Sequence, residues 1–240
     1  MKISIVVPAF NEERLLGASL AQIRSAAGAF TELGWDVELI VCDNNSTDRT
    51  AEIARAAGAT VVFEPFNQIA RARNSGAAAA TGDWLLFVDA DSHPSAGLFA
   101  DAAAAIQSGT CLAGGATVRM DETFFLSGLF TRIWNWTSRW GRLLAGSFIF
   151  VETAVFRQIG GFNNDLFAGE ELDLSKRLKR IAAGTGRRIV ILNSHPLLTS
   201  ARKIRLYTAW DHIRLLVRVV INRRILTQRE SCTLWYDGRR

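Results

Sequence analysis

Apolar residues in the first half of the chain fall into short runs, and the segments between the runs carry apolar residues at helical spacing. The runs predict buried strands at residues 3–7, 37–42, 60–63 and 84–88. The intervening segments predict helices near residues 13–27, 48–57, 69–80 and 96–107. Strands and helices in turn indicate an α/β fold with a parallel sheet covered on both faces. Such sheets bind ligands beyond the carboxyl ends of their strands.

The alternation weakens after Gly114 and Gly115. Residues 123–150 are rich in aromatic residues and glycine, and we interpret them as a second, substrate-facing half of the molecule. The pattern beyond them predicts a helix over residues 169–183, a strand over 187–192 followed by a polar loop, and a last helix over 203–226.

The composition is that of a folded protein, with 240 residues of which 49% are hydrophobic and 21% charged, and one catalytic domain is expected. Cys42, Cys111 and Cys232 lie far apart, without the close pairs of a metal site or a disulfide framework, which favours a reduced, cytoplasmic protein. The chain has no uncharged apolar stretch of about 18 residues and no signal-peptide pattern, so we expect neither a membrane span nor export.

The positive charge is concentrated near the C-terminal end. The net charge is +5 overall, +7 for residues 202–240 and −2 for the rest. No nucleic-acid-binding signature accompanies these arginines, so we expect no nucleic acid partner. We expect residues 201–240 to form a basic amphipathic helical tail, which either contacts an anionic membrane surface peripherally or packs on the domain.

Polar loops follow the first two predicted strands, at residues 8–13 and 43–48. Because both loops lie at the same edge of the sheet, Asp43 is placed to accept a hydrogen from a nucleotide base, and the backbone around Ala9 is placed to flank its ring. Turn formation and helix capping alone are the alternative explanation for these residues.

The fourth predicted strand runs directly into Asp89, Ala90 and Asp91. Two carboxylates held close in a partly dry cleft are unfavourable unless a cation or hydrogen-bond donors compensate them. Oxygen ligands of this kind suit Mg2+ or Mn2+, which complete their shells with substrate phosphates, so a diphosphate partner is implied. A solvated turn is the alternative. His195 is a further candidate metal ligand, with a structural role as its alternative.

Two more polar clusters lie on predicted helices. Arg73 and Asn74 are placed to reach a nucleotide or its phosphates, unless they belong to a solvated basic face. Glu170, Glu171 and Asp173 lie in the first turn of a helix, where the helix dipole accounts for one or two acids but not for three. Adjacent carboxylates compete to ionise, which raises the proton affinity of one of them toward the range of a general base.

In order along the chain, the segments VVPAFNEE, CDNNSTDRT, ARNSG, FVDADSHP, IGGF and GEELDLSKRL resemble the motifs of glycosyltransferase family 2, over about residues 1–185. The resemblance implies a Rossmann-like α/β/α sandwich with a mostly parallel, mixed sheet, which is the A-type glycosyltransferase fold. It implies a catalytic domain over residues 1–200, with a nucleotide-sugar half at 1–118 and an acceptor half at 119–200.

The resemblance also implies site residues. The nucleotide-sugar donor is expected against Pro8, Ala9, Phe10, Glu12, Asp43, Arg73, Asp89 and Ala90, and the metal at Asp91 and Asp89. The family's base is the aspartate of a Glu-Asp pair, and Glu171 stands at that position here. Glu170, Glu171 and Asp173 therefore remain alternative bases. The Gln-x-x-Arg-Trp signature of processive members is missing, which favours the addition of one sugar per encounter.

We therefore expect a metal-dependent, inverting glycosyltransferase that moves one sugar, preferably from a UDP-sugar, to a hydroxyl or lipid-phosphate acceptor in cell-envelope glycan or glycolipid synthesis. It is expected in the cytoplasm or on the inner face of the cell membrane. Trp134, Trp136 and Trp140 lie among arginines and are expected to line the acceptor groove for a glycan or lipid-linked substrate.

Two other functions are weighed against this one. A sugar nucleotidyltransferase would have a glycine-rich phosphate loop after the first strand, which PAFNEE lacks. A catalytically inactive, membrane-associated scaffold of the same fold would not need the intact Asp89, Asp91 and Glu171.

Overall fold

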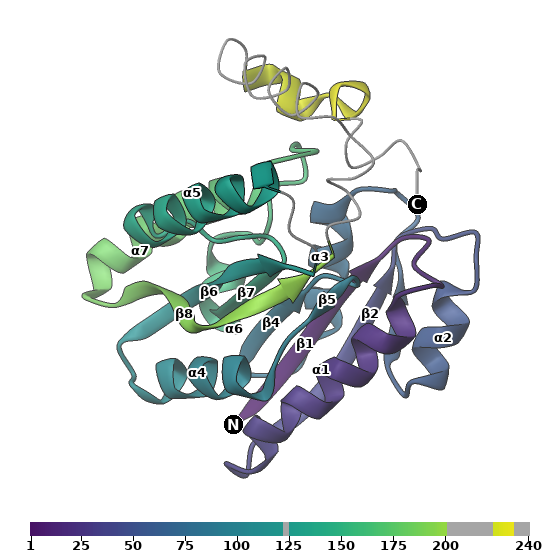
Figure 1. Ribbon diagram of the computed structural model, residues 1–240, viewed down its shortest axis with the longest axis horizontal. Coiled ribbons are helices and arrows are strands. Elements are labelled where there is room, and N and C mark those ends of the chain that lie inside the picture. Colours follow the sequence, from purple (N-terminus) through teal and green to yellow (C-terminus); the bar gives the residue numbers. More distant parts are fainter. Residues whose placement is uncertain (122–124, 201–222, 233–240) are drawn as a thin grey trace.

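The apolar runs of the first half form one side of a continuous sheet (Figure 1). The computed structural model describes residues 1–121, 125–200 and 223–232. Within these residues the sheet has eight strands in the order β3-β2-β1-β4-β7-β6-β8-β5. The strands are β1 (Lys2–Ala9), β2 (Asp36–Asp43), β3 (Thr60–Phe63), β4 (Trp84–Val88), β5 (Ser92–His93), β6 (Cys111–Met120), β7 (Phe148–Glu152) and β8 (Arg188–Thr199).

Helices connect most of these strands. They are α1 (Leu16–Thr31), α2 (Thr50–Ala56), α3 (Ile69–Ala79), α4 (Ala96–Gln107), α5 (Phe125–Gly141), α6 (Thr153–Gln158) and α7 (Glu170–Thr185). Two short 3-10 helices, η1 (Arg223–Thr227) and η2 (Arg229–Ser231), follow near the C-terminal end. None of the helices in the described parts of the chain is both long and apolar enough to cross a bilayer.

The sheet is mixed rather than wholly parallel. Strands β3, β2, β1 and β4 run parallel, as the strand and helix alternation predicts. Strand β7 runs antiparallel to both of its neighbours, β4 and β6, and β5 runs antiparallel to β8. The mostly parallel, mixed sheet implied by the family resemblance is therefore confirmed. The parallel order expected from the alternation holds for the four strands of the first half, and the antiparallel strands β7 and β5 make the sheet mixed.

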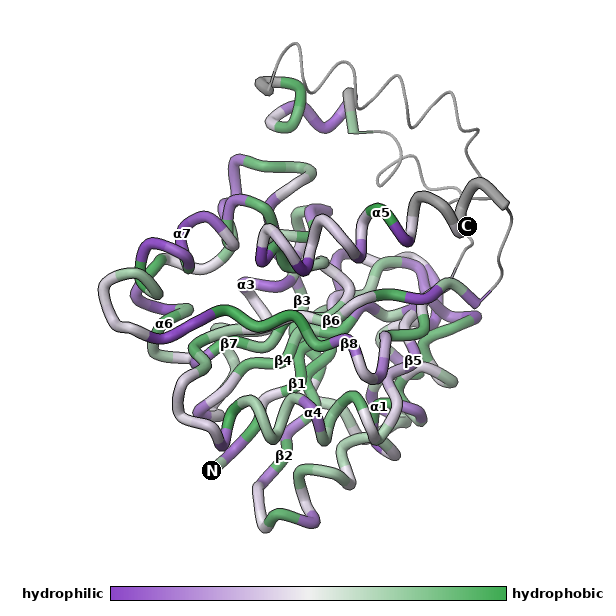
Figure 2. The backbone as a smooth tube through the Cα atoms, turned by 60° about the vertical axis from the view of Figure 1, so that its left-hand side comes forward, coloured by the Kyte–Doolittle hydropathy of each residue, from purple (hydrophilic) through white to green (hydrophobic). Residues whose placement is uncertain are grey.

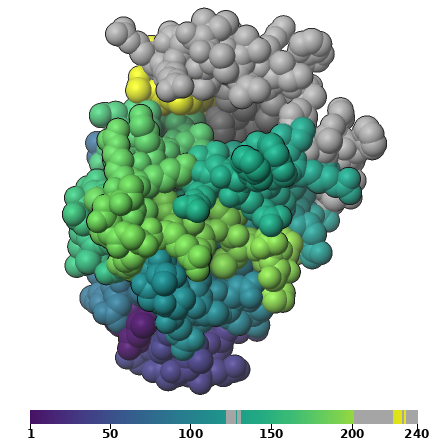
Figure 3. Space-filling model, turned by 90° about the vertical axis from the view of Figure 1, so that its left-hand side faces the viewer, coloured from purple at the N-terminus to yellow at the C-terminus, as the bar shows by residue number. Residues whose placement is uncertain are grey.

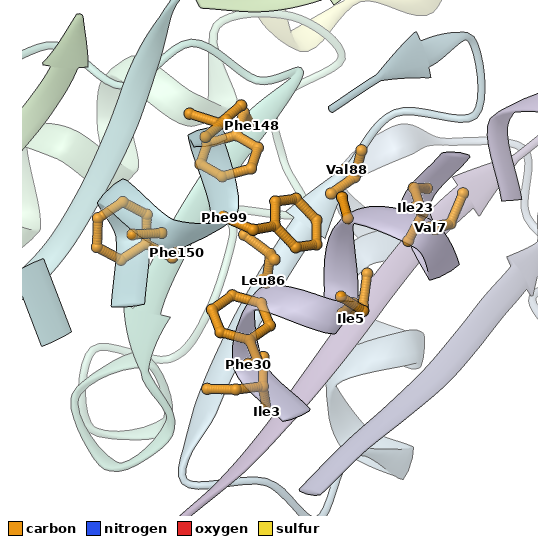
Figure 4. Packing of buried hydrophobic residues seen from close by; sticks show 14 of the residues in the cluster. Ile3, Ile5, Val7, Ile23, Phe30, Leu86, Val88, Phe99, Phe148 and Phe150 are labelled. Atoms are coloured by element: carbon orange, nitrogen blue, oxygen red, sulfur yellow. The ribbon is translucent and has the colours of Figure 1, made fainter. Parts of the chain in front are cut away.

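Apolar side chains alternate between the two faces of the central strands, because successive residues of a strand point to opposite sides. Ile5 of β1 and Leu86 of β4 pack with Phe30 of α1 and Phe99 of α4 on one face (Figure 4). The other face packs against α3, α6 and α7, through side chains that include Val6, Phe87, Phe156 and Leu174. Figure 2 shows the strands as the most hydrophobic part of the chain, enclosed by helices of mixed character. This is the three-layer sandwich that the resemblance implies.

Several elements were not expected from the sequence. Strand β6 contains Gly114 and Gly115, which interrupt the apolar pattern of the sequence. Glycine is needed at position 114, because a side chain there would overlap the Phe150 ring. Strand β8 continues to Thr199 through the expected polar loop. Its pairing with β6 is irregular between Leu192 and Leu197, where a proline lacks the N–H that a regular ladder needs.

The expected last helix over residues 203–226 lies largely outside the described residues. Its described end is the 3-10 helix η1 rather than an α-helix. The expected boundary between the nucleotide-sugar half (1–118) and the acceptor half (119–200) falls within β6, near the end of that strand.

Candidate active site

The ends of β1 and β2 lie side by side, as the parallel pairing predicts. Pro8 is in register with Cys42, and Ala9 with Asp43. Asp43 is buried, and its Oδ1 accepts a hydrogen bond of 3.1 Å from the backbone N–H of Ser46. The neighbouring loop is fastened by Asn11, whose Oδ1 accepts from the N–H of Thr47 at 2.8 Å. These contacts fix Ala9 and Asp43 at one edge of the sheet, where both were predicted to contact the donor.

Glu12 and Phe10, the two other residues of this loop predicted to contact the donor, differ in how deeply they are buried. Glu12 is buried, and its backbone N–H donates to Oγ1 of Thr50 at 2.8 Å. Phe10, two residues earlier, is half-buried. The hydrogen bond from Glu12 to the Thr50 hydroxyl therefore joins the β1 loop to the start of α2.

Arg73 is the most buried charged residue in the described chain, with 1% of its surface exposed. Its Nη1 donates to Oε1 of Glu170 at 2.7 Å, and its Nη2 donates to Oδ1 of Asp89 at 3.0 Å and to the carbonyl of Gly146 at 2.9 Å. The guanidinium also lies over the ring of Phe162, 5.2 Å from its centroid. Arg73 thus bridges the end of β4, the start of α7 and the loop before β7.

This placement changes the interpretation of Arg73. The sequence predicts that Arg73 contacts the nucleotide, whereas in the structure both of its terminal nitrogens donate to protein oxygens. The alternative of a solvated basic face is wrong for Arg73, because the side chain is buried, whereas its contact with the nucleotide stays a prediction. Its role in the structure is to hold acidic groups from distant segments together.

Asp89, Ala90 and Asp91 follow β4 directly. The side chain of Asp89 is 21% exposed, while Ala90 and Asp91 are buried. The carbonyl of Asp89 accepts from the N–H of Ser92 at 3.1 Å, which closes a turn around the three residues. The predicted metal carboxylates thus lie in a tight turn at the carboxyl end of a central strand.

His195 lies elsewhere. Its Nδ1 is 2.9 Å from Oδ2 of Asp101 on α4, and the ring packs over Gly97 of the same helix. Among the residues that the structure describes, no group of three or more His, Cys, Asp or Glu side chains is arranged to hold a metal ion. The structure therefore does not bring His195 together with Asp89 and Asp91, and its contacts fit the structural alternative.

The three acids at the start of α7 have different surroundings. Gly169 precedes them with a φ of 74°, a backbone conformation that favours glycine. Glu170 is buried against Arg73, whereas Glu171 is half-buried. Asp173 pairs with Arg177 one turn further along the helix, at 2.7 Å. Asp173 is thus engaged by an arginine outside the cluster, which favours Glu171 among the three candidate bases.

Burial and like charges shift the proton affinities of these groups. Burial and, after it, the neighbouring charge of Glu170 together raise the pKa of Glu171 to about 8. Burial also raises the pKa of Glu170, although the charge of Arg73 opposes that shift. Glu170, Glu171 and Asp89 therefore surround the single positive charge of Arg73. The excess negative charge favours either proton uptake or a nearby cation.

Two polar residues that fasten this site were not identified from the sequence. Ser175 accepts from the N–H of Leu144 at 2.9 Å and donates to the carbonyl of Glu171 at 2.7 Å. Gln68 donates from Nε2 to the carbonyls of Asn164 and Leu166, both at 2.8 Å. Nothing in the local sequence marks either residue, because their partners are distant in the chain.

Asn74, expected near the nucleotide, instead holds the glycine-rich loop before α7. Its Oδ1 accepts from the N–H of Phe162 at 2.9 Å, and its Nδ2 donates to Oδ1 of Asn164 at 2.8 Å. Gly161 has a φ of 69°, and a side chain there would lie 2.6 Å from Oδ1 of Asn74. The loop therefore needs glycine at this position.

The predicted acceptor tryptophans lie on different sides of α5. Trp134 is half-buried, whereas Trp136 and Trp140 are 62% and 81% exposed. The rings of Trp136 and Trp140 stack on each other, with centroids 5.8 Å apart. The structure thus separates Trp134 from the other two.

A short segment near the C-terminal end contacts the loops beside the site. The carbonyl of Leu226 accepts from the N–H of Phe167 at 2.7 Å. Arg229 donates to Oδ1 of Asn67 at 3.3 Å, and Cys232 is buried. Residues 223–232 therefore connect the loop after β3 with the loop before α7.

Comparison with known proteins gives matches to glycosyltransferases. An uncharacterised glycosyltransferase of Mycobacterium tuberculosis (strain ATCC 25618 / H37Rv) is 36% identical over 113 residues, which is 47% of each chain. The match spans about half the length of these curated relatives.

Solved structures share the fold. Mannosyltransferase PcManGT from Pyrobaculum calidifontis, in complex with GDP-Man and Mn2+, superposes with a TM-score of 0.69 at 23% identity, covering 89% of this chain and 60% of the other. TarS 1-349 of S. aureus, in complex with UDP-GlcNAc, gives a TM-score of 0.66 at 20% identity, covering 99% and 71%. The family model "Glycosyl transferase family 2" matches residues 4–158, well over half of the chain. The protein belongs to glycosyl transferase family 2.

Proposed function

We propose that the protein transfers one sugar from a UDP-sugar to an acceptor hydroxyl or lipid phosphate, with inversion of the anomeric carbon. The observation that carries this proposal is the contact of Arg73 with both Asp89 and Glu170. That contact joins the predicted donor end of β4 to the acid cluster at the start of α7, in which Glu171 is the proposed base. A site that combines donor binding with proton transfer needs these two elements together.

The donor side rests on the paired ends of β1 and β2. We assign Asp43 to the nucleotide base and the backbone of Pro8 and Ala9 to one face of its ring, because these groups are held in register at the sheet edge. TarS and PcManGT were solved with UDP-GlcNAc and GDP-Man respectively. UDP is the nucleotide we propose here, and GDP is the alternative that the experiment below separates from it.

The residues at the end of β4 fit a hard divalent cation by their chemistry. Asp89 and Asp91 supply carboxylate oxygens, and Mg2+ or Mn2+ is commonly held by one or two carboxylates plus substrate phosphates. A third protein ligand is not required. The excess of acidic groups around Arg73 also favours a cation close to Asp89. When bound, the cation would neutralise charge on the leaving diphosphate.

Glu171 is the proposed general base. Its raised pKa, about 8, lets it accept a proton from an acceptor hydroxyl more readily than an ordinary carboxylate does. The hydroxyl oxygen then forms a bond to the anomeric carbon as the bond to the diphosphate breaks, and the proton stays on Glu171. Arg73 holds the side chain of Glu170 at 2.7 Å, so that Glu170 acts as a positioning group rather than a second base.

The alternatives make different demands on the same residues. A nucleotidyltransferase would need phosphate-binding backbone after β1, but Pro8 removes one N–H there and no glycine follows before α1. An inactive scaffold would not require the costly burial of several acids around one arginine. In a transfer reaction these acids would bind the cation, accept the proton and position the base.

Thermal unfolding with nucleotides tests the proposal. The melting temperature of the full chain is measured with UDP, GDP and TDP, each with and without Mn2+. A ligand at about 100 times its dissociation constant should raise the melting temperature by about 5–10 °C, and we expect UDP with Mn2+ to give the largest rise.

Two variants make that test specific. Asp91→Ala should lose the Mn2+-dependent part of the shift. Glu171→Gln should keep the shift but lose transfer of sugar to any acceptor that the parent uses. Donor binding without a metal requirement, or unchanged transfer by Glu171→Gln, would contradict the assignment.

A further inference from the structure

The second half of α5 has two chemically different faces. On the inner face, Asn135 accepts from the N–H of Val118 at 3.0 Å and donates to its carbonyl at 2.9 Å. Ser138 is buried, and its hydroxyl donates to the carbonyl of Leu143 at 2.6 Å. The Asn135 bonds hold α5 against β6, and the Ser138 bond ties it to the loop that follows, so the orientation of the helix is fixed.

The outer face is apolar and exposed. Ile133, Trp136 and Trp140 are 51%, 62% and 81% exposed, and the two indoles stack with an interplanar angle of 24°. Their spacing along the helix places all three on one stripe. Exposed apolar residues are ordinary when scattered, but a contiguous group with two tryptophans marks an interaction surface. Helix α5 lies at the surface of the molecule in Figures 1 and 3.

Two arginines border this stripe. Arg132 and Arg139 are exposed, and at about 100° per residue they lie within about 20° of each other around the helix, next to Trp136. The chain has no acidic residue from Thr123 to Val151, so no carboxylate on this helix neutralises them. The outer face of α5 therefore combines aromatic side chains with uncompensated positive charge.

This combination fits one kind of partner. Tryptophan is favoured at the boundary between lipid headgroups and acyl chains, and arginine beside it attracts anionic lipid phosphates. A second copy of the chain fits less well. A two-fold contact through this face would bring Arg132 and Arg139 of both copies together without an acid between them.

We propose that the outer face of α5, formed by Arg132, Ile133, Trp136, Arg139 and Trp140, docks the protein on the surface of an anionic lipid bilayer. This assigns Trp136 and Trp140 to lipid contact rather than to the acceptor groove. The proposal goes beyond the transfer reaction and does not depend on it, because no donor or acceptor is involved in the contact.

Sedimentation of the full chain with vesicles tests it. Vesicles of phosphatidylcholine are compared with vesicles that also contain phosphatidylserine. The parent should bind the anionic vesicles, and the double variant Trp136→Ser, Trp140→Ser should bind at least tenfold more weakly. The control, Leu33→Ser with Phe63→Ser, removes two exposed apolar side chains from other parts of the surface and should bind like the parent.

The charges are tested separately. Arg132→Gln with Arg139→Gln should weaken binding to anionic vesicles about thirtyfold, since each arginine near such a surface contributes about 1 kcal/mol. The control pair Arg55→Gln and Arg188→Gln removes the same charge from exposed positions outside α5. Equal losses in both pairs would show a general charge effect and would overturn the role of this face.

All variants keep residues 201–240, so the tail contributes equally to each. If Trp136→Ser, Trp140→Ser binds like the parent, or if the parent does not bind anionic vesicles, the proposal is wrong. Self-association that depends on the tryptophans, without vesicle binding, would show that the face joins two copies and would also overturn it. Should the serine variant not fold, quenching of tryptophan fluorescence by brominated acyl chains decides. It must be strong in the parent and reduced in Trp136→Phe, Trp140→Phe.

Discussion

Nη1 of Arg73 lies 2.7 Å from Oε1 of Glu170 across 97 residues of sequence, and both side chains are buried. Removing the arginine leaves a buried carboxylate without its counter-charge. Loss of one partner of such a pair costs about 3–5 kcal/mol. We therefore expect Arg73→Met to lower the free energy of unfolding by about that amount, measured by urea denaturation at pH 7.

The matched control is Arg55→Met on α2, because Arg55 is exposed. That variant should change the free energy of unfolding by less than about 0.5 kcal/mol. Similar effects of the two substitutions would show that the Arg73 contacts do not stabilise the fold.

The raised proton affinity of Glu171 predicts how stability changes with pH. Burial raises its pKa in the folded protein from 4.5 to about 8, so between these values the folded state holds a proton that the unfolded state has lost. The stabilisation is complete below pH 4.5 and is lost as the pH rises through 8. The free energy of unfolding should therefore fall across this window, by at most about 1.4 kcal/mol per pH unit.

Glu171→Gln should flatten this slope when unfolding is followed without metal or nucleotide. Glu170 acts in the same direction, because burial raises its pKa as well, whereas the lowered pKa of Glu38 acts outside the window. Burial opposes the shift of Glu38, but hydrogen bonds from Lys2, Ser4 and Thr81 lower its pKa to about 2, so its contribution is lost only in acid. A slope that persists in Glu171→Gln would show that a different group takes up the proton.

The same carboxyl group should control the pH dependence of transfer. A general base acts in its ionised form, so kcat/KM should rise with pH and level off above a pKa near 8 in the free enzyme. Glu171→Gln should reduce kcat by about 10²–10⁴-fold, because it cannot accept the proton. Asp173→Asn should have a much smaller effect, since Asp173 is engaged by Arg177. The reverse order of the two effects would make Asp173 the base.

The first half of the fold could be predicted from sequence because its central strands, β1 and β4, are buried on both faces, although β3 is largely exposed or half-buried rather than buried as expected. The continuous apolar run WLLFV identifies β4 without any alternation of apolar and polar residues, and the acids that follow it identify the end of the strand. Strand β7 is as apolar and buried as β4 but was assigned to the aromatic-rich segment, whereas β6 was missed for the opposite reason. In β6, glycines allow close packing against Phe150, which removes the apolar signal that a sequence pattern needs.

The site shows a similar division. The positions of Asp43 and Asp89 follow from the rule that parallel strands end at one edge. The role of Arg73 does not, because a buried arginine and a solvent-exposed one look alike in sequence. Only the fold brings Glu170 and Gly146 to its guanidinium.

His195 provides a test of the metal ligands. Its Nδ1 contacts Asp101 rather than the end of β4, so the imidazole should not contribute to cation binding. We expect His195→Ala to keep the Mn2+-dependent rise in melting temperature with UDP, whereas Asp91→Ala loses it. Loss of the rise in His195→Ala, with an unchanged melting temperature of the free protein, would show that His195 is a metal ligand.

Ser175 provides a test of how the base is positioned. Its hydroxyl joins the carbonyl of Glu171 to the N–H of Leu144, two residues before the Gly146 carbonyl that binds Arg73. Ser175→Ala leaves the buried N–H of Leu144 without this acceptor, which should cost about 1–3 kcal/mol in the free energy of unfolding. Because the first turn of α7 then loses one of its supports, kcat should fall more than KM rises. Ser175→Thr keeps the hydroxyl and should restore kcat if the added methyl group fits, whereas a purely structural role would change stability and leave kcat at the level of the parent.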